Sequence, residues 1–211
     1  MLLQDHTVQQ FTEALASNAP APGGGSVAAL EGALGASLTA MVANLTLGRK
    51  AYAEHWALAE ETAAKAEALR VQLNAVMDED TRAYLAVTAA YALPKGTDEE
   101  KAARSAAIQS AMEDCTAVPF STMELCAKVL ELTEGLVGKS NKNAASDLGV
   151  AALSLGSAIR GAWLNVLINL GSLKNAVLAE DYRRRGQALN EIYLPLADRI
   201  YRQVASEIAG E

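Results

Sequence analysis

The sequence predicts an all-α fold, a compact bundle of about seven helices with two long, apolar, small-residue-rich helices at its centre. Hydrophobic residues make up 51% of the 211 residues, whereas aromatic residues make up only 5%. An apolar content carried by alanine favours closely packed helices, because strands are rich in β-branched and aromatic side chains. No internal repeat or low-complexity linker divides the chain, so we expect a single domain over residues 1–211.

Apolar residues recur at helical spacing along most of the chain, and turn signals separate the segments. Pro94-Lys95-Gly96 is the clearest stop signal, and Thr97 with Glu100 forms a capping box that opens the next helix. Pro119 suits the first position of a further helix, and Pro195 predicts a final helix that is bent or split. The expected helices span about residues 3–17, 26–47, 54–93, 97–117, 119–137, 148–173 and 175–208.

Two of these segments, residues 27–47 and 148–173, are long and apolar enough to raise the question of a membrane span. Both contain polar residues, among them Glu31 and Arg160, and amphipathic helices surround them. We therefore expect buried helices of a soluble bundle and no membrane contact. Small residues at every fourth position from Ala28 onward would let another helix approach closely.

The composition also excludes several classes of function. A net charge of -7 argues against general nucleic-acid binding. Cys115 and Cys126 lack metal-ligand spacing, and we expect reduced thiols in a cytoplasmic protein. Residues 1–10 have neither the basic nor the apolar part of a signal peptide. His6 and His55 stand apart from any cluster of ligands, so no metal site is expected.

A proline- and glycine-rich stretch, residues 19–26, runs directly into the first long apolar segment. The prolines hold the entry extended, and glycines without Cβ atoms let the backbone approach another group closely. Ser26 suits the N-cap of the helix, whose free N–H groups would bind an anionic or carbonyl oxygen. The competing interpretation is a tight turn that only lets helices pack. The candidate binding residues here are Pro22, Gly23, Gly24, Gly25 and Ser26.

An acidic cluster, Met77-Asp78-Glu79-Asp80-Thr81, falls inside the third expected helix, although aspartate usually belongs at helix ends. Asp80 shares a face with apolar residues, which predicts partial burial and a raised pKa suited to acid–base chemistry. Asp78 is expected nearer the solvent, with Arg82 as its ion-pair partner. The alternative is a solvated acidic turn without a chemical role.

Polar residues also flank and interrupt the second long apolar segment. Asp147 is expected in its first turn, where capping alone explains a carboxylate, and Asn141 and Asn143 precede it in a polar loop. Asn165 and Asn169 lie inside the segment and need hydrogen-bond partners if they are buried. They would bridge helices, bridge subunits or hold a polar ligand.

Six stretches, spread over nearly the whole chain, carry a resemblance when they are taken in order. They are residues 22–27, 41–50, 77–81, 93–104, 146–150 and 165–170. Together they resemble the cyclodeaminase/cyclohydrolase family of folate enzymes, which includes stand-alone bacterial methenyltetrahydrofolate cyclohydrolases and the C-terminal domain of formiminotransferase-cyclodeaminase. One departure is Ser140, where the family usually has glycine before an asparagine. The stand-alone length and the run Leu-Pro-Lys-Gly-Thr-Asp-Glu-Glu-Lys favour the single-activity bacterial enzymes.

The resemblance implies an all-helical homodimer with a folate site in a cleft near the subunit interface. It also implies an essential aspartate in the acidic cluster, a role that we assign to Asp80 first and Asp78 second, with Asp147 as a further candidate. The expected substrate is a tetrahydrofolate derivative, with or without a polyglutamate tail, and no cofactor is expected. Candidates for binding the anionic tail are Arg49, Lys50, Lys139 and Lys142, and the remaining candidate binding residues are Asn141, Asn143, Asn165 and Asn169.

The expected reaction is hydrolysis of 5,10-methenyltetrahydrofolate to 10-formyltetrahydrofolate. Water attacks the cationic one-carbon bridge, and a carboxylate stabilises the cation, takes a proton from water and returns one to N5. The first alternative is a formiminotetrahydrofolate cyclodeaminase, in which N10 attacks the formimino carbon and ammonia leaves, and which needs the same groups. The second alternative is a non-catalytic folate-binding or scaffold module. The sequence leaves these three open.

Overall fold

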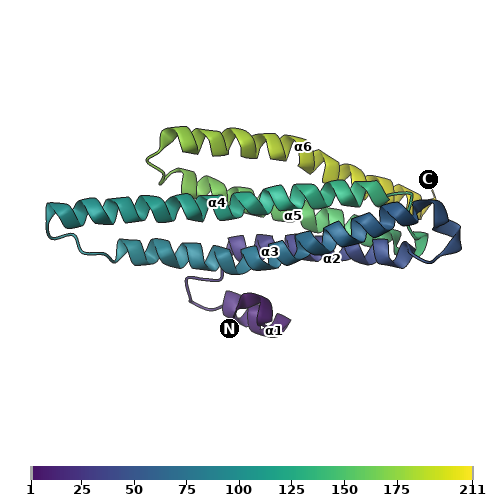
Figure 1. Cartoon of the computed structure of the whole chain (residues 1–211), viewed down its shortest axis with the longest axis horizontal. Coiled ribbons are helices and arrows are strands. Elements are labelled where there is room, and N and C mark those ends of the chain that lie inside the picture. The colour runs from purple at the N-terminus through teal and green to yellow at the C-terminus, as the bar shows by residue number, and fades with distance from the viewer. Residues whose placement is uncertain (1, 211) are drawn as a thin grey trace.

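A computed structural model describes residues 2–210, and this part of the chain contains six α-helices, three short 3₁₀ helices and no strand (Figure 1). The prediction of an all-α fold is therefore confirmed, with one helix fewer than expected. The α-helices are α1 (Val8–Leu15), α2 (Gly24–Thr46), α3 (Trp56–Tyr91), α4 (Asp98–Leu136), α5 (Ala145–Leu170) and α6 (Ala176–Ala209). The 3₁₀ helices span Leu3–Asp5, Lys50–His55 and Lys142–Ala144.

The two apolar helices, α2 and α5, pack against each other, and α3, α4 and α6 cover them. Small residues make this contact close: a Cβ atom on Gly35 of α2 would lie 2.6 Å from the side chain of Leu155 on α5. Leu73, Leu130 and Ile159 are fully buried in the core around this pair. The α3–α4 hairpin extends beyond the turn between α5 and α6, so its end stands free of the central pair (Figure 1).

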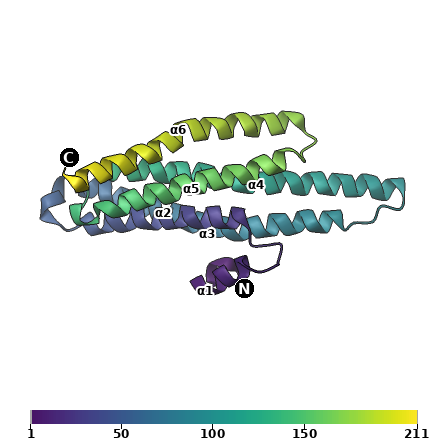
Figure 2. The same cartoon turned by 180° about the vertical axis from the view of Figure 1, so that it is seen from behind.

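Pro119 was expected to start a new helix and Pro195 to bend or split the last helix, but both lie inside continuous helices. α4 runs through Pro119, so the expected break near residue 117 is wrong. Pro119 has no N–H to donate to the carbonyl of Cys115, four residues earlier, and that carbonyl instead accepts a hydrogen bond of 2.8 Å from Nδ2 of Asn169 on α5. α6 runs through Pro195 and is bent rather than split (Figure 2).

Helix starts were the least accurate part of the sequence interpretation. α2 begins at Gly24 with Gly23 as its N-cap, so the expected cap at Ser26 is wrong. α5 begins at Ala145, and its N-cap residue makes no side-chain bond. By contrast, the capping box of Thr97 and Glu100 is present with both of its hydrogen bonds.

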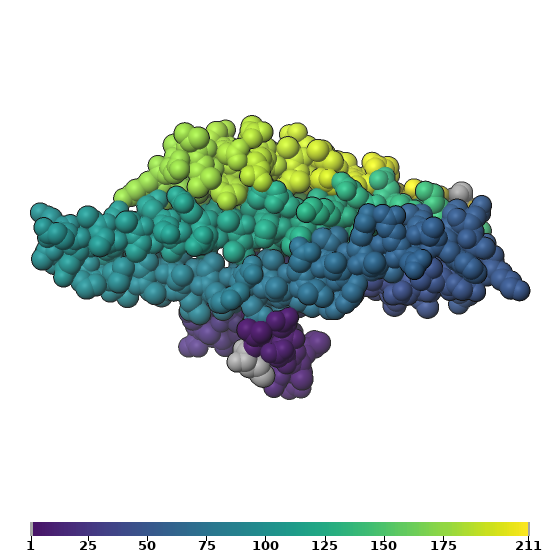
Figure 3. Space-filling model, in the orientation of Figure 1, coloured from purple at the N-terminus to yellow at the C-terminus, as the bar shows by residue number. Residues whose placement is uncertain are grey.

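The N-terminal segment lies against one side of the bundle (Figure 3). It contains the 3₁₀ helix Leu3–Asp5 and α1 in place of the single expected helix. The N–H of Leu3 donates to Oδ1 of Asp78 over 2.6 Å. Asp78 is buried, which corrects the expectation that it lies near the solvent, and Arg82 pairs with Glu79 instead, at 3.7 Å.

Parts of α2 and α5 form an exposed apolar surface, here called the α2/α5 face. By length and composition two helical segments, Gly24–Thr46 and Lys142–Leu170, could cross a membrane, and 61% and 44% of their most apolar windows are buried inside the bundle. The exposed remainder makes the α2/α5 face, whose residues are Leu34, Met41, Leu45, Val150, Leu153, Leu164, Leu167 and Ile168. Exposed apolar side chains gathered on two neighbouring helices are typical of an interaction site.

Candidate active site

The side chain of Asp80, on α3, lies directly against the first turn of α2. Ser26 is fully buried inside the first turn of α2, and its Oγ is 2.9 Å from Oδ2 of Asp80. A Cβ atom on Gly25 would lie only 2.0 Å from Oδ1 of Asp80. Glycine is therefore required at residue 25, because any side chain would occupy the space of the carboxylate.

Ser26 connects Asp80 to a small hydrogen-bond network. Its hydroxyl is also 3.1 Å from the carbonyl of Met77 and 3.3 Å from Oγ1 of Thr81. A hydroxyl has one proton and two acceptor sites. The shortest bond, to Asp80, uses that proton, and Thr81 can then donate to Ser26. The carboxylate is thus oriented through a chain of neutral groups.

The pKa of the Asp80 carboxyl is raised above its ordinary value. Burial is the largest cause, because it penalises the charged form, whereas hydrogen bonds from the side chain and backbone of Ser26 lower the pKa and offset burial in part. A carboxylate that holds a proton more tightly than usual is suited to proton transfer.

Asp80 and the glycine-rich turn line the same pocket, with a volume of about 350 Å³. Among the residues that line it, Asp80 is the only carboxylate, and none is lysine, arginine or histidine. A lone carboxylate in a small, partly enclosed pocket favours a ligand with positive charge. The lining residues are Pro20, Ala21, Gly23, Gly24, Gly25, Asp80, Tyr84, Cys115, Asn165, Ile168, Asn169 and Ser172.

Two asparagines of α5 reach this pocket, and each has a defined partner. Nδ2 of Asn169 donates to the carbonyl of Cys115 that Pro119 leaves free. Nδ2 of Asn165 donates to the carbonyl of Gly161, one turn earlier in α5, over 2.8 Å. The first bond joins α5 to α4 beside the pocket, which both Asn169 and Cys115 line. Burial, and to a lesser degree the charge of Asp80, raise the pKa of the Cys115 thiol, so this thiol stays neutral.

Asp78, which the sequence also proposed for the site, does not line the pocket and instead accepts a hydrogen bond from the N–H of Leu3. The structure separates the other residues that the sequence proposed for the site into two groups. Gly23, Gly24, Gly25, Asp80, Asn165 and Asn169 line the pocket, Ser26 binds Asp80, and Pro22 is buried in the same turn. The second group lies around the opposite ends of α2 and α5, and a helix of this length places it roughly 33 Å away. It consists of Arg49, Lys50, Lys139, Asn141, Lys142, Asn143 and Asp147.

The polar residues of this second group hold the backbone in place. Asn141 is buried; its N–H donates to Oγ1 of Thr46 over 3.0 Å, and its Nδ2 donates to the carbonyl of Leu45 over 3.3 Å. The N–H of Lys142 donates to the hydroxyl of Tyr52 over 3.1 Å. These bonds join the loop before α5 to the end of α2.

Tyr84, Cys115 and Ser172 line the pocket but were not among the site residues proposed from the sequence. Tyr84 lies one turn beyond Asp80 on α3, and that spacing was the available signal. Cys115 and Ser172 are placed by tertiary packing and left no local signal. Within residues 2–210 no group of three or more His, Cys, Asp or Glu residues could hold a metal ion.

Comparisons with known proteins agree with this architecture. A family model described as formiminotransferase-cyclodeaminase matches residues 7–188. The chain is 43% identical to a methenyltetrahydrofolate cyclohydrolase of Methylorubrum extorquens, over 97% of this chain and 98% of that protein. It is 35% identical to a formimidoyltransferase-cyclodeaminase of Rattus norvegicus, over 89% of this chain but only 35% of that protein.

A solved structure has the same fold over nearly the full length. The crystal structure of a formiminotetrahydrofolate cyclodeaminase from Thermotoga maritima superposes with a TM-score of 0.81 at 26% identity, covering 99% of this chain and 98% of that one. The match of the family model and the identity to one relative over its full length lead to one conclusion: this chain belongs to the formiminotransferase-cyclodeaminase family.

Proposed function

We propose that this protein is a methenyltetrahydrofolate cyclohydrolase, which hydrolyses 5,10-methenyltetrahydrofolate to 10-formyltetrahydrofolate. The observation that carries the proposal is Asp80, the only carboxylate lining its pocket, which has a raised pKa and lies against the first turn of α2. The relative named for this activity, at 43% identity over nearly the whole chain, supports the same choice.

Asp80 performs the proton transfers of the reaction. In its ionised form it stabilises the amidinium cation of the substrate, where the positive charge is delocalised over N5, the bridging carbon and N10. Water adds to the bridging carbon, and Asp80 accepts a proton from that water. Asp80 then returns the proton to N5 as the bond between N5 and the carbon breaks, and the hydroxyl proton of the adduct is released as the formyl C=O bond forms. One proton is released overall, because a cation and water give a neutral formyl product.

The first turn of α2 binds an oxygen atom of the substrate. The first N–H groups of a helix have no partner within the helix, and the helix dipole makes this end positive. Gly23 and Gly24 line the pocket without side chains that would shield those groups. Because the reaction consists of water addition and proton transfer, we propose that it needs no metal or redox cofactor.

A formiminotetrahydrofolate cyclodeaminase is the second candidate. The Thermotoga maritima structure with a TM-score of 0.81 carries that description, and attack by N10 with loss of ammonia would use the same carboxylate. Both substrates should be offered to the purified protein side by side. Loss of the 5,10-methenyl chromophore supports the cyclohydrolase, ammonia release from the formimino compound supports the cyclodeaminase, and folate binding without turnover of either supports a non-catalytic module.

We also propose that the protein acts as a homodimer in which a second copy covers the α2/α5 face. A groove of about 580 Å³ between α2 and α5 on this side shares Gly24 and Asn165 with the Asp80 pocket, so a dimer would place each active site beside the interface. Sedimentation should show a dimer, and Leu164→Glu on this face should give a monomer. Two free cysteines support a reducing cytoplasmic location.

A further inference from the structure

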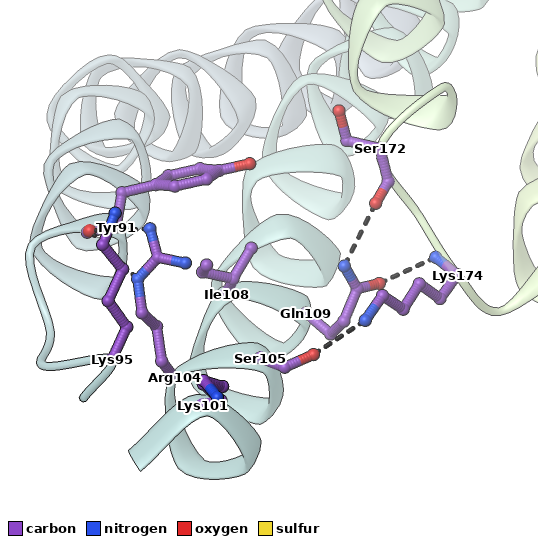
Figure 4. A pocket seen from close by; sticks show the side chains of 9 residues that line it. All are labelled: Tyr91, Lys95, Lys101, Arg104, Ser105, Ile108, Gln109, Ser172 and Lys174. Carbon is purple, nitrogen blue, oxygen red and sulfur yellow. Dashed lines mark hydrogen bonds between the residues drawn. The ribbon is translucent and has the colours of Figure 1, made fainter. Parts of the chain in front are cut away.

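A second pocket, with a volume of about 500 Å³, opens near the end of the α3–α4 hairpin (Figure 4). In a protein of net charge -7, this pocket is lined by four cationic side chains and no acidic one. Figure 4 shows Lys95 and Arg104 on one side and Lys174 on the other, with Ile108 between them. The lining residues are Tyr91, Lys95, Lys101, Arg104, Ser105, Ile108, Gln109, Ser172 and Lys174.

Neutral groups hold two of these cations in place. Nε and Nη2 of Arg104 both donate to the carbonyl of Tyr91, over 3.2 and 2.9 Å, and the guanidinium lies 5.5 Å from the centroid of the Tyr91 ring. Nζ of Lys174 donates to Oγ of Ser105 over 2.7 Å. Within residues 2–210, no carboxylate lies at ion-pair distance from Arg104, Lys174 or Lys95.

The fourth cation, Lys101, has a carboxylate partner but a weak one. Its ammonium lies 2.8 Å from Oδ1 of Asp98, and both side chains are largely exposed. Water and salt screen such a pair, so it contributes little. The pocket therefore keeps a positive potential that its own side chains do not neutralise, and a ligand with several negative charges would complete it.

The cationic pocket adjoins the Asp80 pocket. Ser172 lines both pockets. Gln109 of α4 holds the segment between α5 and α6 in place, because its Nε2 donates to the carbonyl of Ser172 over 3.1 Å and its Oε1 accepts from the N–H of Lys174 over 2.7 Å. α3 passes from Asp80 to Tyr91 over eleven residues, roughly 16 Å. The two pockets thus lie in tandem along α3 and α4.

We propose that the cationic pocket binds the carboxylates of the glutamate portion of the folate whose one-carbon end lies at Asp80. This inference rests on the proposed function. In every folate an aromatic spacer and an amide separate the reacting carbon from the glutamate carboxylates, so a folate site needs its cations away from the catalytic carboxylate. Lys95, Arg104 and Lys174 meet that requirement within one protomer, whereas Arg49, Lys50, Lys139 and Lys142 lie around the far ends of α2 and α5.

The test is a pair of double variants that each remove two positive charges. Lys95→Gln/Lys174→Gln should raise the KM for triglutamyl 5,10-methenyltetrahydrofolate by about tenfold with kcat unchanged, because binding of a remote group is lost. Lys65→Gln/Arg82→Gln, which changes two exposed cations of α3 outside both pockets, should leave KM unchanged. Equal KM values for the two double variants overturn the proposal.

A binding measurement separates this inference from the proposed function. If the wild-type protein turns over neither folate substrate, the proposed function fails, and calorimetry with tri-γ-glutamate alone then decides about the pocket. The proposal is supported if tri-γ-glutamate binds to the wild type and to the Lys65→Gln/Arg82→Gln control but not to the Lys95→Gln/Lys174→Gln variant. No binding to the wild type overturns it, and so does equally tight binding of inorganic phosphate, because the pocket would then take any anion.

Discussion

The two ends of α2 use the same kinds of residues in opposite ways. At its first turn, Asp80 and the asparagines of α5 keep polar atoms beside a pocket, and the carboxyl pKa is raised by burial. At its last turn, Asn141 donates its hydrogen bonds to Thr46 and to the backbone of α2. Polar groups that remain beside a cavity can act on a ligand, whereas groups bonded to the backbone stabilise the fold. The sequence did not distinguish the polar residues at the two ends of α2, and residues from both ends were proposed for the site.

The largest expected effect is on Asp80. Asp80→Asn should lower kcat by about 10² to 10⁴-fold, because it removes the group that transfers the proton. The variant should be at least as stable as the wild type at neutral pH, since it no longer buries a charge. Kinetics and denaturant unfolding check the two parts. The control is Glu79→Gln, an exposed neighbour paired with Arg82; full activity of Asp80→Asn would remove Asp80 from the mechanism.

The raised pKa of Asp80 also predicts how this difference in stability depends on pH. In the folded state Asp80 binds its proton more tightly than in the unfolded state, where the pKa is near 3.8. The wild type therefore loses stability as the pH rises from that value through the raised folded-state pKa. The free energy of unfolding of Asp80→Asn relative to wild type should increase over that window, and kcat of the wild type should fall as the pH drops through it.

The next largest effect is expected at Gly25. In Gly25→Ala the new Cβ atom would lie 2.0 Å from Oδ1 of Asp80, so the carboxylate or α2 must move. We expect a loss of about 10²-fold in kcat and about 1–3 kcal/mol in stability. Gly48→Ala, near the other end of α2, should cost about 1 kcal/mol for its φ of +74° without lowering kcat. If Gly25→Ala and Gly48→Ala lowered kcat by similar factors, the two ends of α2 would not differ in function as we propose.

A smaller effect is expected where α5 is joined to α4. Asn169→Ala leaves the carbonyl of Cys115 without its donor and should destabilise the fold by about 1–3 kcal/mol. Adding Pro119→Ala supplies an N–H within α4 and should recover part of that loss. A double-mutant cycle on chemical unfolding measures the coupling. Strict additivity would show that the two residues act independently.

The smallest kinetic effects are expected at the far end. Asn141→Ala should destabilise the protein by about 1–3 kcal/mol while kcat/KM of the folded variant changes by less than about twofold. Asp147→Asn should also leave kcat within about twofold. Steady-state kinetics beside thermal melts separate stability from turnover. If Asp147→Asn lost as much activity as Asp80→Asn, the partner subunit of a dimer would be bringing its far end to the Asp80 pocket.

The sequence predicted what depends on local pattern. The helical class and the capping box at Thr97 followed from apolar spacing and turn chemistry, and the partial burial and raised pKa of Asp80 followed from the apolar residues on its face. The burial of Asp78 did not follow, because its partner is the N–H of Leu3, seventy-five residues away. Pro119 was read as a helix start for the same reason: the donor that lets α4 continue belongs to another helix.

The bond from Asn169 to the carbonyl opposite Pro119 has a consequence for relatives of this chain. Pro119 leaves the carbonyl of Cys115 without a donor inside α4, and the side-chain amide of Asn169 supplies that donor while satisfying its own N–H group. An alignment of homologues should therefore show residues 119 and 169 changing together. Chains that have lost the proline should tolerate apolar residues at position 169 and should set their fourth and fifth helices at a different spacing.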